Sequence, residues 1–238
     1  MKQEELEARA AAILKRFDPE GSRRVGSSSP FMVELFGTPK SGKSTMKEML
    51  KHFFRRNGWS VSTPVEGAEV VELPRDEPQY NFQTTEYALG KARELSYNPR
   101  FHLGIFDRAN MDGIVRMEYY AKKKIITAEE QATIEGYYLL PWNIELFDAH
   151  VCLVTSPEVA IRRELSRALT KKHGKTMNPD TLRELLAAHR SVWQRMKKST
   201  DVLEESMCWH DSSEEKEAET AKEILSFVLG VLEARLLK

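Results

Sequence analysis

The chain has 238 residues, enough for one α/β domain with a sizeable core or for a domain with a small appendage. Its 36 basic and 36 acidic side chains give a formal net charge of zero, which argues against a protein that binds nucleic acid over its whole surface. No apolar run approaches the ~20 residues of a membrane span, and the N-terminus lacks the apolar core of a signal peptide. We therefore expect a cytoplasmic protein without a membrane or nucleic-acid partner.

The first 30 residues differ in composition from the rest. Apolar side chains recur at helical spacing over residues 1–17, which predicts an amphipathic helix. Residues 18–30 are rich in Gly, Ser and Pro, which predicts a linker. We therefore divide the chain into an N-terminal helix with its linker (1–30) and one domain (31–238).

Short apolar runs alternate with helical patterns through the rest of the chain. Strands are expected at residues 31–36, 59–63, 102–107, 149–154 and 206–210. Helices are expected at residues 44–54, 84–95, 112–122, 128–140, 157–169, 178–196 and 214–237. This alternation predicts an α/β fold with a five-stranded parallel sheet and helices on both faces. Cys152 and Cys208 fit no metal-binding spacing and are expected to be buried thiols.

One residue conflicts with this pattern. Glu34 lies in the first strand, which should be central and buried. A buried carboxylate needs partners, so Glu34 must face a polar junction or pair with a basic group.

The first strand runs into the sequence GTPKSGKS, which satisfies the phosphate-binding P-loop pattern G-x-x-x-x-G-K-[ST]. Glycines let successive backbone N–H groups point at phosphates, and the following helix adds the positive end of its dipole. Lys43 is expected to reach the β- and γ-phosphates of ATP, and Ser44 to offer its hydroxyl to Mg²⁺. The nucleotide-binding residues are then Gly37, Thr38, Pro39, Lys40, Ser41, Gly42, Lys43, Ser44 and Thr45.

Asp107 and Arg108 end the third expected strand. A carboxylate there can hold Mg²⁺ or take a proton from an attacking hydroxyl, and an arginine can clamp a phosphate. A third cluster follows residue 157, where Arg163 and Arg167 share a helix face and a basic, glycine-containing tip comes after them. We expect this segment (about 163–178) to be a lid whose arginines neutralise the moving phosphoryl group.

Together these motifs resemble the deoxynucleoside kinase and thymidylate kinase group of P-loop kinases, from residue 31 to the C-terminus. The resemblance implies the P-loop NTPase three-layer sandwich, a helical lid, ATP and Mg²⁺ as cofactors, and a kinase that could be a homodimer. The sequence YNFQTTEYALGKAR is similar to the helix whose glutamine hydrogen-bonds the base in the nucleoside kinases, which would be Gln83 here.

The sequence also departs from that group. Asp107-Arg108-Ala109 replaces Glu-Arg-Ser, and the expected lid lacks an arginine near Leu169 that Lys171 or Lys172 could replace. The motif that carries the catalytic base is also altered. Glu66 is our candidate, with Glu69 and Glu72 as rivals.

The expected reaction is phosphoryl transfer from ATP to a nucleoside or a nucleoside monophosphate. Glu66 or Asp107 would orient and deprotonate the acceptor hydroxyl, while Arg108 and the lid arginines stabilise the γ-phosphoryl. A monophosphate acceptor needs another cation, for which Arg75 or Arg93 could serve. His210 and Asp211 could flank the adenine. The alternative is a regulatory ATPase that hydrolyses ATP without a small-molecule acceptor.

Overall fold

A computed structural model describes residues 2–18, 29–166, 172, 174–198, 201–214 and 216–237. Its strands are β1 (Phe31–Gly37), β2 (Val61–Ser62), β3 (Leu103–Asp107), β4 (Ala149–Val154) and β5 (Met207–Asp211). Its longer helices are α1 (Gln3–Phe17), α2 (Lys43–Arg56), α3 (Pro78–Ser96), α4 (Asn110–Lys122), α5 (Ala128–Tyr138), α7 (Pro157–Leu165), α8 (Pro179–Lys197) and α10 (Glu217–Arg235). Three short helices complete the described chain: η1 (Gly67–Glu69), α6 (Pro141–Ile144) and α9 (Asp201–Ser206).

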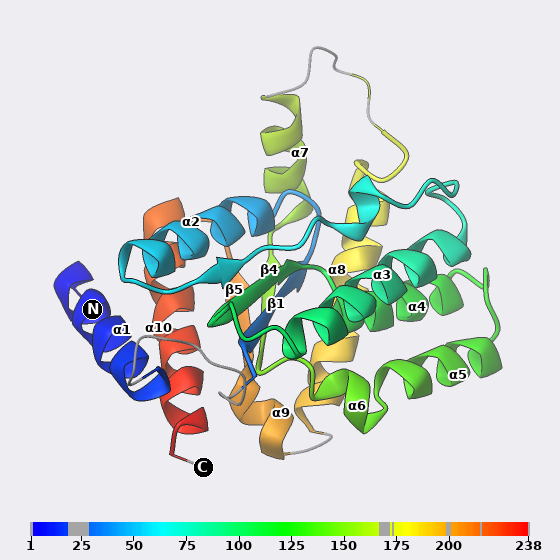
Figure 1. Cartoon of the computed structure of the whole chain (residues 1–238). Coiled ribbons are helices and arrows are strands. Elements are labelled where there is room, and N and C mark those ends of the chain that lie inside the picture. Colours follow the sequence, from blue (N-terminus) through cyan, green and yellow to red (C-terminus); the bar gives the residue numbers. More distant parts are fainter. Residues whose placement is uncertain are drawn as a thin grey trace.

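The strands form one parallel sheet in the order β2-β3-β1-β4-β5. β1 lies at its centre, and all seven of its residues are buried because helices cover both faces. One core cluster joins the sheet to α1, α2 and α10, and the other joins it to α3, α4 and α8. Figure 1 shows these two layers on opposite sides of the sheet, which confirms the three-layer α/β architecture.

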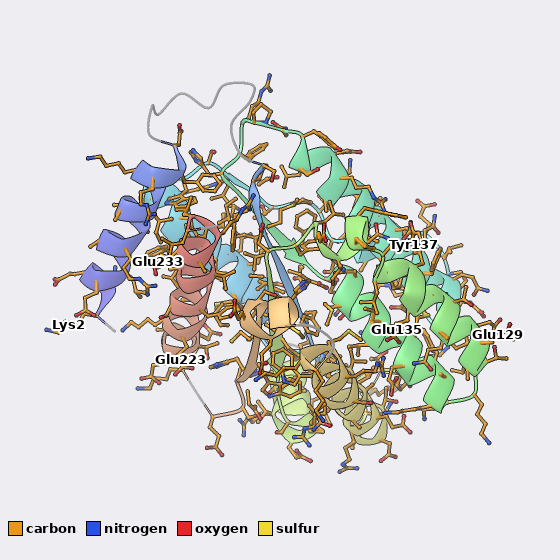
Figure 2. All side chains as sticks on the ribbon, turned by 90° about the horizontal axis from the view of Figure 1, so that it is seen from below. Lys2, Glu129, Glu135, Tyr137, Glu223 and Glu233 are labelled. Carbon is orange, nitrogen blue, oxygen red and sulfur yellow. The ribbon has the colours of Figure 1, made fainter. Side chains whose placement is uncertain are left out.

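The two flanks of the molecule are occupied by α1 and α5. In Figure 2 Lys2, the N-cap of α1, and Glu129 of α5 lie at opposite ends of the view. Leu6, Ala10 and Ile13 of α1 are buried in the same core cluster as β1, and Arg9 forms an ion pair with Glu233 of α10. The N-terminal helix therefore packs as part of the layer formed by α2 and α10.

Several expected boundaries differ from the structure. The second strand is only two residues long, Val61–Ser62, because it is an edge strand paired with β3 alone. The helix expected at 84–95 begins earlier, at Pro78, since proline is favoured in the first helical turn. The helix expected at 157–169 ends at Leu165, and residues 167–171 lie outside the described part. The expected linker (18–30) falls mostly outside it too.

No helix in the described ranges combines the length and apolarity needed to cross a membrane.

Candidate active site

The P-loop follows β1 directly, and its first glycine is required by close packing. A Cβ atom on Gly37 would lie 1.7 Å from the carbonyl oxygen of Leu153 on β4, and its φ of 140° disfavours other residues. Gly42, also in the left-handed region at φ 97°, is the N-cap of α2. The loop therefore curls so that the N-terminus of α2 points into it, an arrangement that binds anions.

Lys43 and Ser44 open α2 with their polar atoms toward this loop. Lys43 is buried, and its Nζ donates hydrogen bonds to the carbonyl oxygens of Gly37 (3.0 Å) and Thr38 (2.8 Å). Burial, together with the nearby positive charge of Arg108, lowers the pKa of Lys43 to about 8. The ammonium group thus lies beside two carbonyl oxygens of the loop. The oxygens of a bound phosphate carry negative charge and would accept stronger hydrogen bonds from it than these neutral carbonyls do.

Asp107 ends β3, and its register beside Leu35 of β1 brings it to the P-loop. Ser44 Oγ donates to Asp107 Oδ2 at 2.8 Å, whereas the buried Oδ1 makes no hydrogen bond with any described residue. A hydroxyl and a carboxylate with a spare oxygen fit Mg²⁺, which prefers oxygen ligands and takes few from protein when phosphates bind it. The described residues contain no cluster of three or more His, Cys, Asp or Glu suited to a metal.

Arg108 follows Asp107, and its side chain points toward Glu66 and Asp112. Arg108 has a φ of 70°, a left-handed conformation that costs a non-glycine residue roughly 1–2 kcal/mol. Its Nε lies 3.1 Å from Glu66 Oε1, and its Nη1 lies 3.6 Å from Asp112 Oδ2. One turn along α4, Arg116 Nε is also 3.6 Å from Asp112 Oδ2. Two arginines and two carboxylates therefore form one cluster, here called the acceptor cluster (Glu66, Arg108, Asp112 and Arg116).

A glycine brings Glu66 to this cluster. Glu66 precedes η1, and a Cβ on the next residue, Gly67, would lie 2.7 Å from the backbone oxygen of Thr84 in α3. Only glycine permits so close an approach of η1 to α3. Glu69 and Glu72 are exposed to solvent, whereas Glu66 is partly buried and faces Arg108. Of these three glutamates, Glu66 is the one that contacts Arg108, and its role as the base stays a prediction.

The surroundings of Glu66 and Asp112 shift the pKa values of these two carboxylates in opposite directions. Burial raises the pKa of Glu66 above its usual value, and the positive charge of Arg108 opposes that shift only in part. Burial also acts on Asp112, but the guanidinium groups of Arg108 and Arg116 hold its pKa below the usual range. A carboxylate with a raised pKa is the better proton acceptor, and one held ionised is suited to fixing neighbouring cations.

Arg163 of α7 reaches the P-loop, but its polar atoms are engaged there. It donates to the carbonyl oxygen of Lys40 (2.9 Å) and to Ser212 Oγ (3.2 Å) and O (2.7 Å). In this arrangement Arg163 ties α7 to the P-loop and to the segment after β5. Its expected role on the γ-phosphoryl stays a prediction, and Arg167, Lys171 and the start of the lid tip lie outside the described residues.

A cavity of ≈ 430 Å³ connects these groups. Its walls are the P-loop and the start of α2, the catalytic candidates Glu66, Asp107 and Arg108, and residues Arg163, Ser166, Ser212, Glu217 and Thr220. Ser212 was not anticipated, and no sequence pattern singles it out. Asp112 and Arg116 were also missed, although their i,i+4 spacing within the expected helix 112–122 was a usable signal.

Other predicted residues lie away from this cavity or serve packing. Gln83 is exposed and is not among the residues that line the cavity, so its contact with a base stays a prediction. Arg93 donates to Asn143 Oδ1 at 2.6 Å, which joins α3 to α6. Arg75 is exposed in the loop before α3. His210 lies 3.1 Å from Thr220 Oγ1 and thereby joins β5 to α10.

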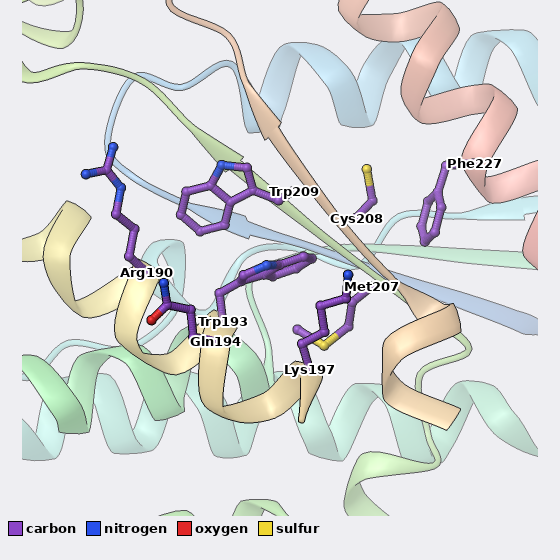
Figure 3. A pocket seen from close by; sticks show the side chains of 8 residues that line it. All are labelled: Arg190, Trp193, Gln194, Lys197, Met207, Cys208, Trp209 and Phe227. Atoms are coloured by element: carbon purple, nitrogen blue, oxygen red, sulfur yellow. The ribbon is translucent and has the colours of Figure 1, made fainter. Parts of the chain in front are cut away.

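A second, more open groove of ≈ 590 Å³ lies beside β5 (Figure 3). It shares no lining residue with the P-loop cavity. Trp193 of α8 and Trp209 of β5 meet there with ring centroids 5.5 Å apart. Its lining contains two cations, Arg190 and Lys197, but no carboxylate, so it offers no acid–base pair. We therefore place the candidate active site at the P-loop cavity.

Neither a protein-family model nor a curated protein matches the sequence. Solved structures do resemble the fold. A deoxyadenosine kinase from M. mycoides with bound dCTP superposes with a TM-score of 0.55 at 16% identity, over 82% of this chain and 97% of that one. The same kinase with bound dATP gives 0.54 at 17% identity, over 82% and 98%. The chain therefore has a deoxyadenosine kinase-like P-loop fold.

Proposed function

We propose that this chain transfers the γ-phosphoryl group of ATP to a hydroxyl of a nucleoside. The observation that carries the proposal is the position of the acceptor cluster. Glu66, a carboxylate with a raised pKa, lines the same cavity as the P-loop lysine, Lys43. It also forms an ion pair with Arg108, the residue that follows Asp107 in the chain. A phosphate-binding loop beside a partly buried proton acceptor is suited to phosphoryl transfer.

In the proposed reaction ATP binds with its phosphates in the P-loop, on the N-terminus of α2 and on Lys43. Glu66 accepts the proton of the attacking hydroxyl, and Arg108 balances the charge of the transferring group. Ser44 and Asp107 would hold Mg²⁺, which neutralises charge on the β- and γ-phosphates when bound. The transition state of such reactions is loose, so positioning and electrostatics contribute more than the strength of the base.

Charge balance favours a nucleoside over a nucleoside monophosphate. The acceptor cluster contains two arginines and two carboxylates, so the charges of its side chains balance. Arg93, which could bind the phosphate of a monophosphate acceptor, already donates a hydrogen bond to Asn143. An uncharged acceptor keeps this balance, whereas a dianionic phosphate would lie beside the partly buried carboxylate of Glu66 and the buried carboxylate of Asp112. The likeness to deoxyadenosine kinase structures is consistent with a nucleoside acceptor.

A panel assay tests the proposal. ATP consumption is measured with Mg²⁺ alone, with each of the common nucleosides and deoxynucleosides, and with their monophosphates. We expect stimulation by at least one nucleoside and formation of its 5′-monophosphate. Glu66→Gln should remove that stimulation, while the matched control Glu69→Gln, at an exposed site three residues along the chain in η1, should retain it.

Two outcomes would contradict the proposal. Steady hydrolysis that no acceptor stimulates, and that Glu66→Gln leaves unchanged, would favour a regulatory ATPase. Stimulation by monophosphates alone would show that the charge-balance argument fails and that a cation outside the described residues completes the acceptor site.

A further inference from the structure

The carboxylate of Glu34 lies at the centre of the sheet and takes no direct part in the proposed reaction. Glu34 has no exposed surface, and its strand, β1, pairs on both sides, with β3 and β4. A carboxylate at such a position is costly unless every oxygen is hydrogen-bonded. Its partners therefore show what it does.

Four donors converge on Glu34. Oε1 accepts from the backbone N–H groups of Ala109 (2.8 Å) and Asp112 (3.1 Å). Oε2 accepts from the backbone N–H of Met111 (3.2 Å) and lies 3.0 Å from His150 Nδ1, on the neighbouring strand β4. Both side chains of this pair are fully buried. With Glu34 ionised, His150 donates through Nδ1.

These contacts supply α4 with a cap that its own sequence lacks. The N-cap residue is Ala109, which has no side-chain oxygen to accept from the first turn. The carboxylate of Glu34, on β1, accepts hydrogen bonds from those N–H groups instead. Its negative charge also lies at the positive end of the helix dipole, which is the favourable sign.

The same contacts fix the turn that carries the catalytic candidates. Arg108 is in the left-handed region, and its N–H donates to Leu35 O at 2.9 Å, one residue along β1 from Glu34. The Ala109 N–H held by Glu34 comes next in the chain. Asp107 and Arg108 thus lie on a strained turn whose C-terminal end is held by hydrogen bonds to β1. Backbone strain of this kind persists only where surrounding contacts hold the conformation.

We infer that the buried Glu34–His150 pair is a positioning device for the active site: it locks the β3–α4 turn so that Asp107 faces Ser44 and Arg108 faces Glu66. The inference rests on the proposed function for its effect on turnover, but not for its effect on nucleotide binding. Glu34 and His150 touch no substrate in this scheme and act through Asp107 and Arg108.

Glu34→Gln tests this inference because the amide keeps the shape of the side chain but replaces one acceptor oxygen with a donor. Two readouts are measured well below the unfolding temperature. The first is the affinity for a fluorescent ATP analogue with and without Mg²⁺. We expect Mg²⁺-free binding to stay near the wild-type value and the enhancement by Mg²⁺ to fall by about tenfold, as for groups that orient a metal ligand. The second is turnover, where kcat should fall by about 10²-fold.

Asp148→Asn is the matched control. Asp148 is partly buried and also binds β1, through the N–H of Met32 at 2.7 Å, but it lies near the end of that strand away from the P-loop and pairs with Arg235. Asp148→Asn should lower thermal stability without changing the Mg²⁺ enhancement. Equal losses of Mg²⁺ enhancement in the two variants would overturn the inference, because a general loss of stability would then explain both.

The design separates this inference from the proposed function. If no nucleoside is phosphorylated by the wild-type protein, the Mg²⁺ enhancement of nucleotide binding still tests the role of Glu34. Should Glu34→Gln not fold, His150→Leu removes one of the four donors without adding a polar group. It should reduce the Mg²⁺ enhancement relative to Asp148→Asn, and an unchanged enhancement would overturn the inference.

Discussion

The two halves of the candidate site are built in different ways. On the donor side, Lys43 and Ser44 have hydrogen-bond partners, and the geometry depends on backbone and glycines. On the acceptor side, buried atoms of Arg108, Asp112 and Arg116 make no hydrogen bond with the described residues. The donor side is thus built mainly from one contiguous segment, to which β3 adds Asp107, whereas the acceptor side combines side chains from separate elements. Both sides keep buried polar atoms that make no hydrogen bond with the described residues, Asp107 Oδ1 on the donor side among them.

The largest effect is expected from breaking the donor half. Lys43→Ala removes the buried cation of the P-loop and should reduce turnover by about 10³-fold, since no other described side chain occupies its place. Steady-state kinetics with saturating acceptor measure this loss. Lys51→Ala, on the same helix but paired with Glu48, should have little effect. Near-normal turnover in Lys43→Ala would remove the P-loop from the mechanism.

Breaking the acceptor half should slow chemistry while sparing ATP binding. Glu66→Gln removes the proposed base and should lower kcat by about 10²-fold with an unchanged KM for ATP. The pH profile sharpens the assignment. Burial raises the pKa of Glu66, so wild-type kcat should rise with pH through a range above that of an ordinary glutamate. The variant should lose this acid limb; if the limb persists, another group is the base.

Alkaline pH should weaken the donor half alone. Lys43 has a pKa lowered to about 8, so its charge is present below that pH and is lost above it. The affinity of the free protein for an ATP analogue should therefore be higher at pH 7 and fall by about tenfold by pH 9. A fluorescence titration at both pH values measures the change. A constant affinity would mean that Lys43 stays charged throughout.

Asp112→Asn probes how the acceptor half is held together. The change leaves Arg108 and Arg116 without their shared carboxylate charge and should lower the free energy of unfolding by about 2 kcal/mol. We also expect the acceptor KM to rise about tenfold, because the two guanidinium groups lose their alignment. Urea denaturation and acceptor titrations give the two values. A stability loss without a change in acceptor KM would make Asp112 purely structural.

The smallest effect is expected at Gln83. Its side chain is exposed outside the cavity, so Gln83→Ala should change the acceptor KM by less than about threefold, the range of ordinary surface substitutions. Acceptor titrations with several bases check this. A larger effect confined to one base would support the predicted contact between Gln83 and the base.

The contrast between the halves also explains what the sequence could predict. The P-loop and the alternating strands followed from local patterns, because each is contiguous and its residue types are dictated by geometry. Glu34 was flagged as anomalous, but its partners on β4 and α4 could not be named, since neither is near it in sequence. Glu66 was the preferred candidate, but Glu69 and Glu72 remained as rivals, because the close approach of Gly67 to α3 is not visible in the sequence.

Contacts of the lid were the hardest to anticipate. The sequence placed Arg163 on a moving phosphoryl group, yet in the structure its guanidinium is bonded to Lys40 O and to Ser212. An arginine prefers whatever acceptors are within reach, and here backbone carbonyls supply them. The helix and its charge were predictable from the pattern, but the partner depended on how α7 packs beside the segment after β5.

The N-terminal helix gives the molecule a built-in optical probe. Trp59 is buried, donates its indole N–H to Ala10 O at 3.2 Å and packs against Phe17 of the same helix. Undocking of α1 would bring water to this indole and shift its emission to longer wavelength. The contribution of Trp59 to the emission can therefore report the attachment of α1 independently of catalysis. The same contact means that a chain begun at residue 30 would expose an aromatic surface and lose solubility.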